Sequence, residues 1–329
     1  MKIFMIGDFV TSSGPASVNK VIKKYADNDF IFSKKNKNVE RVCELIKNIR
    51  MCDAVIFSGL SKINLLGIYI AKVFCKKSAY IMHGYSRLEN EINKVNNIII
   101  IKLEEKIINK VDKVICVSKT FGDYMKKQYP TLENKIYNIQ NPIKIEFNEE
   151  KINSNKRNRN NLLSLGGGLP IKNIKAICKA VEIINNERTK ENRLNLIVIG
   201  GDGADLPEIK KYNFVDYRGK VDYKKIEEYY SMSSLYIQNS LFETFGIAPL
   251  EALKNGCDIL ISKNVASKEV ISTLLENDII NDANSIEEIK EKIKYNIDIS
   301  NSKRLYEGID IDSINPINVI NRIKEIITI

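Results

Sequence analysis

The sequence contains no tryptophan, one histidine and seven prolines among its 329 residues. A single histidine cannot build a histidine-based metal centre, and the six cysteines show no metal-ligand spacing. Several cysteines lie inside apolar runs, as Cys116 does in residues 114–117, which is typical of reduced core cysteines in a cytoplasm. We therefore expect neither a metal site, nor a cofactor, nor disulfide bonds.

Long apolar runs are also missing. The longest, residues 63–75, is interrupted by Lys72 and is too short to span a bilayer. Residues 1–8 carry one lysine and too short an apolar run for a signal peptide. With 44% hydrophobic and 28% charged residues, the composition predicts a soluble, cytoplasmic globular protein, and the length favours two domains.

Positive charge is concentrated in the first half. Residues 1–150 contain 25 Lys and Arg against 16 Asp and Glu, a net charge of +9, whereas residues 151–329 have a net charge of +1. One interpretation is drift in an Asn-, Ile- and Lys-rich composition. The other is an anionic partner, such as a lipid-linked acceptor or the inner face of the cell membrane. Nucleic acid is not expected, because no basic stripe, recognition motif or aromatic platform accompanies the charge.

Strand and helix patterns alternate along both halves of the chain. Short apolar runs alternate with segments of helical periodicity, the runs being 2–6, 54–58, 78–82 and 113–117 and the segments 17–25, 39–49, 65–75 and 94–110. This alternation predicts an α/β protein with doubly wound parallel sheets. A polar stretch at residues 146–161 separates the domains, which we place at 1–150 and 151–314, with a closing helix at about 315–329.

The most informative segment is residues 239–256, in which Glu243 and Glu251 bracket a loop that leads into a short helix. Pro249 suits a first helical turn and Gly256 the position after the helix end. The first N–H groups of that helix would be open to a phosphate. A carboxylate can accept both hydroxyls of a sugar diol, and a nucleotide sugar carries diols on both sides of its diphosphate. Alternatively, Glu251 complements the helix dipole and Glu243 is a solvated loop charge.

This segment resembles the Glu-x7-Glu signature of retaining glycosyltransferases of the large family four, which have the GT-B fold. Three upstream blocks also resemble the family's strands and glycine-rich turns, at residues 163–173, 196–203 and 215–230. The resemblance implies two Rossmann-like domains facing a central cleft. It places the donor nucleotide mainly on the second domain and the acceptor on the first, and it implies that the terminal helix packs back on the first domain.

The resemblance also implies roles for individual residues. Glu251 matches the carboxylate that holds the ribose diol, Glu243 the one beside the donor sugar, and Lys172 the lysine that neutralises the diphosphate. His83, at the end of an apolar run, matches a histidine near the donor sugar and the scissile bond; a hydrogen-bonded structural histidine is the alternative. The other expected donor-binding residues are Gly14, Gly168, Gly219, Lys220, Val221, Phe245, Gly246 and Ile247.

The implied reaction transfers a hexosyl unit from a nucleotide sugar, expected to be UDP-linked, to a hydroxyl of a glycan or lipid-linked acceptor. The family resemblance implies retention at the anomeric carbon, independence of metal, and a role in cell-surface polysaccharide assembly. One departure is that residues 166–171 lack the arginine that the family usually has shortly before Lys172. This departure leaves open a nucleotide-sugar-binding subunit without catalysis. Among enzymes, the alternative is a sugar-nucleotide epimerase or phosphorylase on the same fold.

Overall fold

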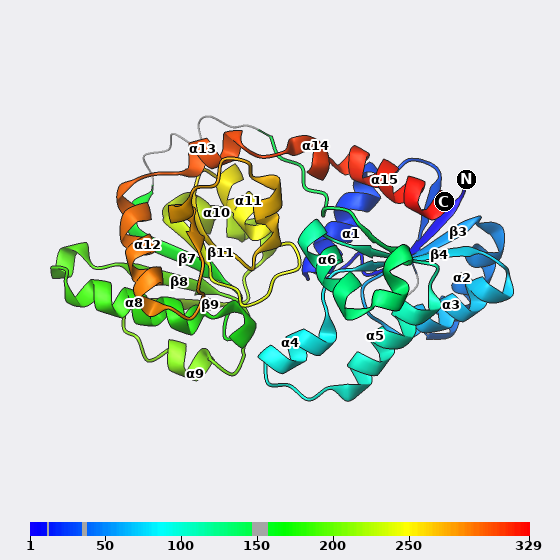
Figure 1. Cartoon of the computed structure of the whole chain (residues 1–329), viewed down its shortest axis with the longest axis horizontal. Coiled ribbons are helices and arrows are strands. Elements are labelled where there is room, and N and C mark those ends of the chain that lie inside the picture. The colour runs from blue at the N-terminus through cyan, green and yellow to red at the C-terminus, as the bar shows by residue number, and fades with distance from the viewer. Residues whose placement is uncertain (12, 35–37, 147–156) are drawn as a thin grey trace. The chain divides into compact units, whose positions relative to one another are not determined.

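The computed structural model describes residues 1–11, 13–34, 38–146 and 157–329. Contacts between Cα atoms divide the chain into two compact units (Figure 1). The first comprises Met1–Asn90, Asn96–Lys144 and Asp312–Ile329, and the second comprises Glu91–Val95 and Ile145–Ile311. The domain limit expected between residues 150 and 151 lies outside the described residues. No helix among the described residues is long and apolar enough to cross a membrane.

The first unit is built on a parallel sheet with the strand order β2-β1-β3-β4-β5-β6. Its strands are β1 (Ile3–Ile6), β2 (Phe30–Phe32), β3 (Ala54–Ser58), β4 (Lys77–Met82), β5 (Lys113–Cys116) and β6 (Ile136–Asn138). The helices that accompany them are α1 (Gly14–Tyr25), α2 (Asn38–Met51), α3 (Lys62–Val73), α4 (Ser86–Ile92), α5 (Ile98–Lys110), α6 (Lys119–Gln128), η1 (Pro130–Lys135), α14 (Ile311–Ile314) and α15 (Pro316–Thr328). Strands β1 and β3 are buried throughout, as expected of a parallel sheet covered on both faces.

The terminal helix α15 belongs to the first unit, where it packs against α1 and β4. Lys324 forms ion pairs with Asp27 and with Asp29, the latter at 2.8 Å. Arg322 Nη1 donates to Gln140 Oε1 at 3.1 Å. These polar contacts join the end of the chain to segments that precede residue 144.

The second unit contains a parallel sheet with the order β12-β11-β10-β7-β8-β9. Its strands are β7 (Asn158–Leu165), β8 (Asn195–Ile199), β9 (Val215–Gly219), β10 (Ser233–Gln238), β11 (Asp258–Ser262) and β12 (Ile279–Ile280). Its helices are η2 (Pro170–Lys172), α8 (Ile174–Asn186), η3 (Lys190–Asn192), α9 (Leu206–Ile209), α10 (Tyr223–Met232), α11 (Ala248–Lys254), η4 (Ala266–Val270), η5 (Glu276–Asp278), α12 (Ile286–Asp298) and α13 (Ser302–Glu307). Helices α8 and α12 pack over the centre of this sheet, and their core includes Leu162, Ile177, Val181, Leu235, Ile289 and Ile293.

The strand order reverses once in each sheet, between β1 and β3 in the first and between β7 and β10 in the second. In open α/β sheets, ligands bind beyond the carboxyl ends of the strands at such a switch point. The turns that follow β1, β3, β7 and β10 are therefore the places where each unit offers a site.

The predicted α/β class, with two doubly wound Rossmann-like sheets, is confirmed. Three predicted helix starts are wrong. Helix α3 begins at Lys62 rather than at residue 65, because the hydroxyl of Ser61 accepts from Ile63 N at 3.2 Å and caps the helix there. Helix α1 begins at Gly14 rather than at residue 17, because the hydroxyl of Ser13 accepts from Ala16 N at 3.3 Å and caps the helix there. The helix expected from residue 94 begins at Ile98, because Asn97 Oδ1 accepts from Ile100 N at 3.2 Å.

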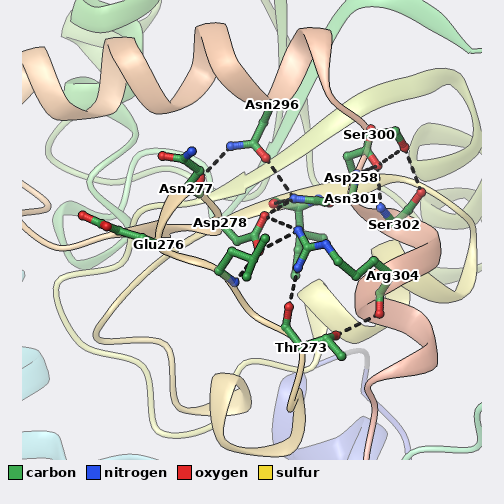
Figure 2. Close-up of polar contacts among 12 residues, drawn as sticks. Asp258, Thr273, Glu276, Asn277, Asp278, Asn296, Ser300, Asn301, Ser302 and Arg304 are labelled. Atoms are coloured by element: carbon green, nitrogen blue, oxygen red, sulfur yellow. Dashed lines mark hydrogen bonds and ion pairs between the residues drawn. The ribbon is translucent and has the colours of Figure 1, made fainter.

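A buried polar network, which the sequence did not predict, joins β11, η5 and α13 in the second unit (Figure 2). The carboxylate of Asp278, which is 1% exposed, accepts from Arg304 Nη2 at 3.0 and 2.9 Å. Leu275 N donates to the same carboxylate at 2.7 Å. Asn301 Nδ2 donates to Asp278 Oδ1 at 2.8 Å, and Asn301 N donates to Asp258 Oδ1 at 2.9 Å. The buried carboxylate of Asp278 is thus partnered by a cation and by neutral hydrogen-bond donors.

Candidate functional site

Two glycine turns interlock beyond the carboxyl ends of β7 and β8. Gly166, Gly167 and Gly200 have φ angles of 132°, 59° and 147°, which favour glycine. A Cβ atom on Gly167 would lie 2.0 Å from Gly201 O, and one on Gly200 would lie 2.3 Å from Gly167 N. Gly168 N donates to Gly201 O at 3.1 Å. The backbone of the predicted donor-binding residue Gly168 is therefore held against the neighbouring turn.

Lys172 and Glu243 form an ion pair beside these turns. The lysine stem crosses Gly166, where an added Cβ atom would lie 2.3 Å from Lys172 Cγ. Lys172 Nζ pairs with Glu243 Oε2, and the two side chains are 24% and 17% exposed. Gln238 Nε2 donates to the same oxygen at 2.9 Å, and Tyr236 OH donates to Gln238 Oε1 at 3.0 Å. Glu243 is thus a partnered residue at the switch point, and the alternative of a solvated loop charge is wrong.

The loop that follows Glu243 is closely packed. Gly246 has a φ angle of 85°, and a Cβ atom there would lie 3.0 Å from Val265 Cγ1 and 3.1 Å from Glu243 Cγ. Phe245 is 1% exposed and its carbonyl accepts from Ser267 N at 2.6 Å, so its side chain belongs to the core. The carbonyl of Ile247 accepts from Glu251 N at 3.1 Å and opens α11. Contacts of this loop with a sugar or phosphate stay a prediction.

Glu251 lies in the first turn of α11 and is held by two tyrosines. Tyr223 OH donates to Oε1, and Tyr230 OH donates to Oε2 at 3.4 Å. Tyr230 is buried and packs edge-on against Tyr236, with 5.6 Å between ring centroids, whereas Tyr223 is 46% exposed. Burial raises the pKa of Glu251 and outweighs the two tyrosine hydroxyls, which act in the opposite direction. The sequence did not identify these tyrosines.

Lys220 is a second cation at the glycine turns. Gly219 ends β9 with a φ angle of 65°, and Lys220 and Val221 follow in the loop before α10. A Cβ atom on Gly201 would lie 2.9 Å from Lys220 Cε and 3.8 Å from its Nζ. The side chains of the two predicted lysines therefore lie against the two interlocked turns. Lys172 contacts the turn after β7, and Lys220 contacts the turn after β8.

In the first unit, His83 directly follows the carboxyl end of β4, and β4 is the neighbour of the switch-point strand β3. His83 Nε2 lies 2.9 Å from Ser58 Oγ, the Ser58 hydroxyl donates to Asn19 Oδ1 at 2.6 Å, and Asn19 Nδ2 donates to Asp8 O at 3.0 Å. Because Ser58 gives its proton to Asn19, His83 Nε2 carries a proton and donates to Ser58. Burial lowers the pKa of His83 to about 4, so the ring is neutral at pH 7. This network holds the ring in place. The alternative role, that of a hydrogen-bonded structural histidine, is therefore present at His83.

Gly14 is the first residue of α1. A Cβ atom added to Gly14 would meet no other atom within 4 Å, so the space around it is open. Approach of a ligand to its backbone stays a prediction. His83 and Gly14 belong to the first unit, whereas the residues from Gly168 to Glu251 that were predicted to bind the donor belong to the second.

Known proteins resemble this chain in family and in fold. Residues 145–307 match the model of the family "Glycosyl transferases group 1". No curated protein sequence matches this chain. Among solved structures, Anabaena HepE in complex with UDP-glucose aligns with a TM-score of 0.74 and 13% identity, over 100% of this chain and 99% of that chain. The lipopolysaccharide outer core galactosyltransferase WaaB aligns with a TM-score of 0.63 and 16% identity, over 100% and 99%.

A third structure, S. aureus TarM in complex with fondaparinux, alpha-GlcNAc-glycerol and UDP, aligns with a TM-score of 0.67 and 15% identity, over 90% of this chain and 60% of that one. At these identities the likeness shows the fold alone. The second unit, which carries Lys172, Glu243 and Glu251, thus matches the glycosyl transferases group 1 family, and the chain as a whole has the GT-B fold.

Proposed function

We propose that this protein is a retaining, metal-independent glycosyltransferase. It moves a hexosyl unit from a UDP-sugar to a hydroxyl of a glycan or lipid-linked acceptor during cell-surface polysaccharide synthesis. The observation that carries the proposal is the convergence of Lys172 and Glu243 on the glycine turns at the β7–β10 switch point. The family match and the structures of the same fold that hold UDP-glucose or UDP support it.

Two lysines suit the diphosphate of such a donor. Lys172 and Lys220 lie on adjacent turns, and each supplies a compact charge on a flexible stem that can follow a departing phosphate. Lys220 would compensate for the arginine that residues 166–171 lack. With this charge supplied by the protein, the transfer does not require a metal.

Binding of the nucleotide-sugar donor would rearrange the ion pair between Lys172 and Glu243. An incoming phosphate competes for the ammonium group of Lys172, because charge-assisted bonds to phosphate are strong. Glu243 Oε2 then loses one hydrogen-bond donor, Lys172 Nζ, while it keeps the other, Gln238 Nε2, at 2.9 Å. The carboxylate becomes able to accept a hydroxyl of the donor sugar. Donor binding thus exchanges the ion pair of Lys172 for one with phosphate, and Glu243 is then held by neutral hydrogen-bond donors.

Retention at the anomeric carbon needs a route that differs from that of retaining hydrolases, which place a carboxylate nucleophile about 5 Å from an acid. Glu243 is already bonded to a lysine and an amide. In the proposed same-face substitution, the bond from the anomeric carbon to the phosphate oxygen breaks as the bond to the acceptor oxygen forms. The departing phosphate takes the acceptor proton. Since the pKa of His83 is about 4, its neutral ring would contribute a hydrogen bond and not a proton.

The test is to incubate the full-length chain with UDP-glucose, UDP-galactose, UDP-N-acetylglucosamine and GDP-mannose, with and without simple glycoside and polyprenyl-diphosphate-sugar acceptors. We expect UDP release that depends on the acceptor and persists in EDTA, with an unchanged anomeric configuration by NMR. Binding without release would indicate a non-catalytic subunit, and interconversion of sugars without net UDP release an epimerase. Either result would overturn the proposal.

A further inference from the structure

Helix α3 carries an apolar stripe on its exposed side. Leu66, Tyr69 and Val73 are 39%, 46% and 76% exposed. Their i, i+3, i+7 spacing places them on one face of the helix. The other side of α3 is buried, and its buried residues are Asn64, Gly67, Ile68 and Ala71.

Helix α5 lies beside α3 (Figure 1) and also carries exposed apolar residues. Ile98, Ile99 and Ile100, in its first turn, are 52%, 70% and 38% exposed. Lys102 and Lys106 follow Ile98 at four-residue intervals and are exposed on the same side. We name as the α3–α5 face the exposed residues Lys62, Leu66, Tyr69, Lys72, Val73, Ile98, Ile99, Ile100, Lys102 and Lys106.

The α3–α5 face carries lysines and almost no exposed acid. Helix α3 contains neither Asp nor Glu. Of the two glutamates in α5, Glu104 is 3% exposed and Glu105 pairs with Arg87. Within the described part of the chain, none of the four lysines of this face forms an ion pair. Their charges are therefore available to an anionic partner.

We propose that the α3–α5 face binds the surface of a bilayer that contains anionic lipids. Exposed apolar side chains beside unpaired lysines fit the boundary between lipid headgroups and acyl chains, where apolar groups enter and lysines stay level with the phosphates. The net charge of +9 on residues 1–150 adds a longer-range attraction. This surface would bring the enzyme to a lipid-linked acceptor, but its binding to lipid does not depend on the proposed transfer reaction.

The test is flotation of the full-length chain with vesicles of phosphatidylcholine alone and of phosphatidylcholine mixed with phosphatidylglycerol. We expect binding to the anionic vesicles at low salt, weakening steeply as salt rises, and poor binding to the neutral ones. Lys102→Glu with Lys106→Glu should lower the partition coefficient at least about fivefold per lysine. Tyr69→Ser with Val73→Ser should weaken binding and leave its salt dependence unchanged.

The matched control is Lys23→Glu with Lys24→Glu, which makes the same change of charge at exposed positions of α1. We expect this variant to bind vesicles nearly as well as the natural chain. An equal loss in both charge variants would show that net charge, and not this face, drives binding. No binding at low salt, equal binding to both vesicles, or a dimer that the α3–α5 variants dissociate would also overturn the proposal.

A second observation concerns the carboxylate of Glu251. Its two oxygens each accept a tyrosine hydroxyl, from Tyr223 on Oε1 and from Tyr230 on Oε2. A carboxylate has about four acceptor sites, so each oxygen keeps one for another hydroxyl. Two donors from different positions of α10 fix the plane of the carboxylate without neutralising it.

We infer that Tyr223 and Tyr230 are positioning residues that orient Glu251 to accept both ribose hydroxyls of the nucleotide. This inference rests on the proposed function. Tyr223 is the residue to test, because it is 46% exposed and its ring can stay in place in Tyr223→Phe, whereas Tyr230 is buried. The variant removes one donor to Glu251 and changes nothing else in the side chain.

Calorimetry of the full-length chain with UDP and with 2′,3′-dideoxy-UDP separates the outcomes. Tyr223→Phe should bind UDP about fivefold to tenfold more weakly and bind the dideoxy nucleotide within about twofold of the natural chain. Equal losses for both nucleotides would show a role outside ribose recognition, and tighter UDP binding would show that the phenol occupies the ribose position; both overturn the inference. Failure of the natural chain to bind UDP would overturn the proposed function as well.

Discussion

Each unit buries a carboxylate, Asp278 in the second and Glu104 in the first, and the two carboxylates have different partners. In the second unit, Asp278 is paired with Arg304 and Glu243 with Lys172. In the first, Glu104 is 3% exposed and accepts from Ser86 N at 2.8 Å and from Ser86 Oγ at 3.1 Å, with no ion pair among the described residues. Burial raises the pKa of Glu104 to about 8. A buried carboxylate such as Glu104, which is held by neutral donors, couples folding to the binding of a proton.

Glu251 belongs to the second unit but resembles Glu104 in its partners, since its oxygens accept tyrosine hydroxyls and burial raises its pKa. Glu243 and Glu251, which lie on either side of one loop, are thus suited to bind different groups. Glu243 is already engaged with a cation that a phosphate could take over. Glu251 is bonded to hydroxyls, which is how a carboxylate recognises a diol.

The largest expected effect is on stability in the second unit. In Asp278→Asn, Arg304 would lose its counter-charge and the network around Asn301 would lose an acceptor. We expect a loss of about 3–4 kcal/mol, the lower part of the range for a buried pair, because Arg304 is 36% exposed. Urea unfolding of the full-length chain measures it.

The control for Asp278 is Glu287→Gln, which breaks an i, i+3 pair with Lys290 in α12; the side chain of Glu287 is 71% exposed. It should change stability by less than about 0.5 kcal/mol. Similar losses in the two variants would show that burial of the pair does not decide its contribution.

The next effect is on turnover. Lys172→Ala should lower kcat about 100-fold to 1000-fold, because the contact of the lysine strengthens as charge develops on the departing phosphate, and it should change acceptor affinity less. Lys175→Ala, at a lysine of α8 that pairs with Asp205 at 3.4 Å, is the matched control. Turnover near the natural level in Lys172→Ala would mean that Lys220 or another cation holds the diphosphate alone.

The proton coupled to Glu104 predicts a pH dependence. The pKa is about 8 in the folded chain against an ordinary value of 4.5, so the folded state binds the proton more tightly. Its stabilising contribution is fully present below about pH 4.5 and is lost as pH rises through about 8, with a slope of up to about 1.4 kcal/mol per pH unit. Between pH 5 and pH 7, the free energy of unfolding of the natural chain should fall by about 2–3 kcal/mol through this group, and Glu104→Gln should remove that fall.

Urea midpoints measured at several pH values test this dependence. Glu105→Gln, at the neighbouring glutamate that pairs with Arg87, should keep the slope of the natural chain. If Glu104→Gln kept it too, the pH dependence would have to come from another group.

The sequence predicted the sheets because buried parallel strands are continuous apolar runs, as in β5 (Lys113–Cys116). Local chemistry also placed Pro249 in the first turn of α11 and Gly256, with a φ angle of 70°, after its end. The pairing of Lys172 with Glu243 could not be derived from spacing. The two residues are 71 positions apart, and it is the order of β7 and β10 in the sheet that brings them together.

The partners of the other site residues could not be predicted for the same physical reason. Ser58 and Asn19 are 39 positions apart, and nothing in their local sequence marks them as partners of His83. Tyr223 and Tyr230 look like ordinary residues of an amphipathic helix until α10 packs against α11. Single polar side chains form such contacts only after the apolar pattern has set the register of the sheets.

The smallest expected effect tests Glu251 itself. An amide in Glu251→Gln accepts at one oxygen only, and its nitrogen presents a donor to a ribose hydroxyl and to one of the two tyrosine hydroxyls. We expect UDP to bind about tenfold more weakly, which is about 1.5 kcal/mol and at the lower end for hydrogen bonds to a charged group, because the tyrosines can rotate to donate elsewhere. Calorimetry at pH 8 favours the ionised form of this carboxylate, because burial raises its pKa. Unchanged affinity for UDP would leave Glu251 as a residue that only complements the dipole of α11, and Glu243 would then differ from it in function as well as in partners.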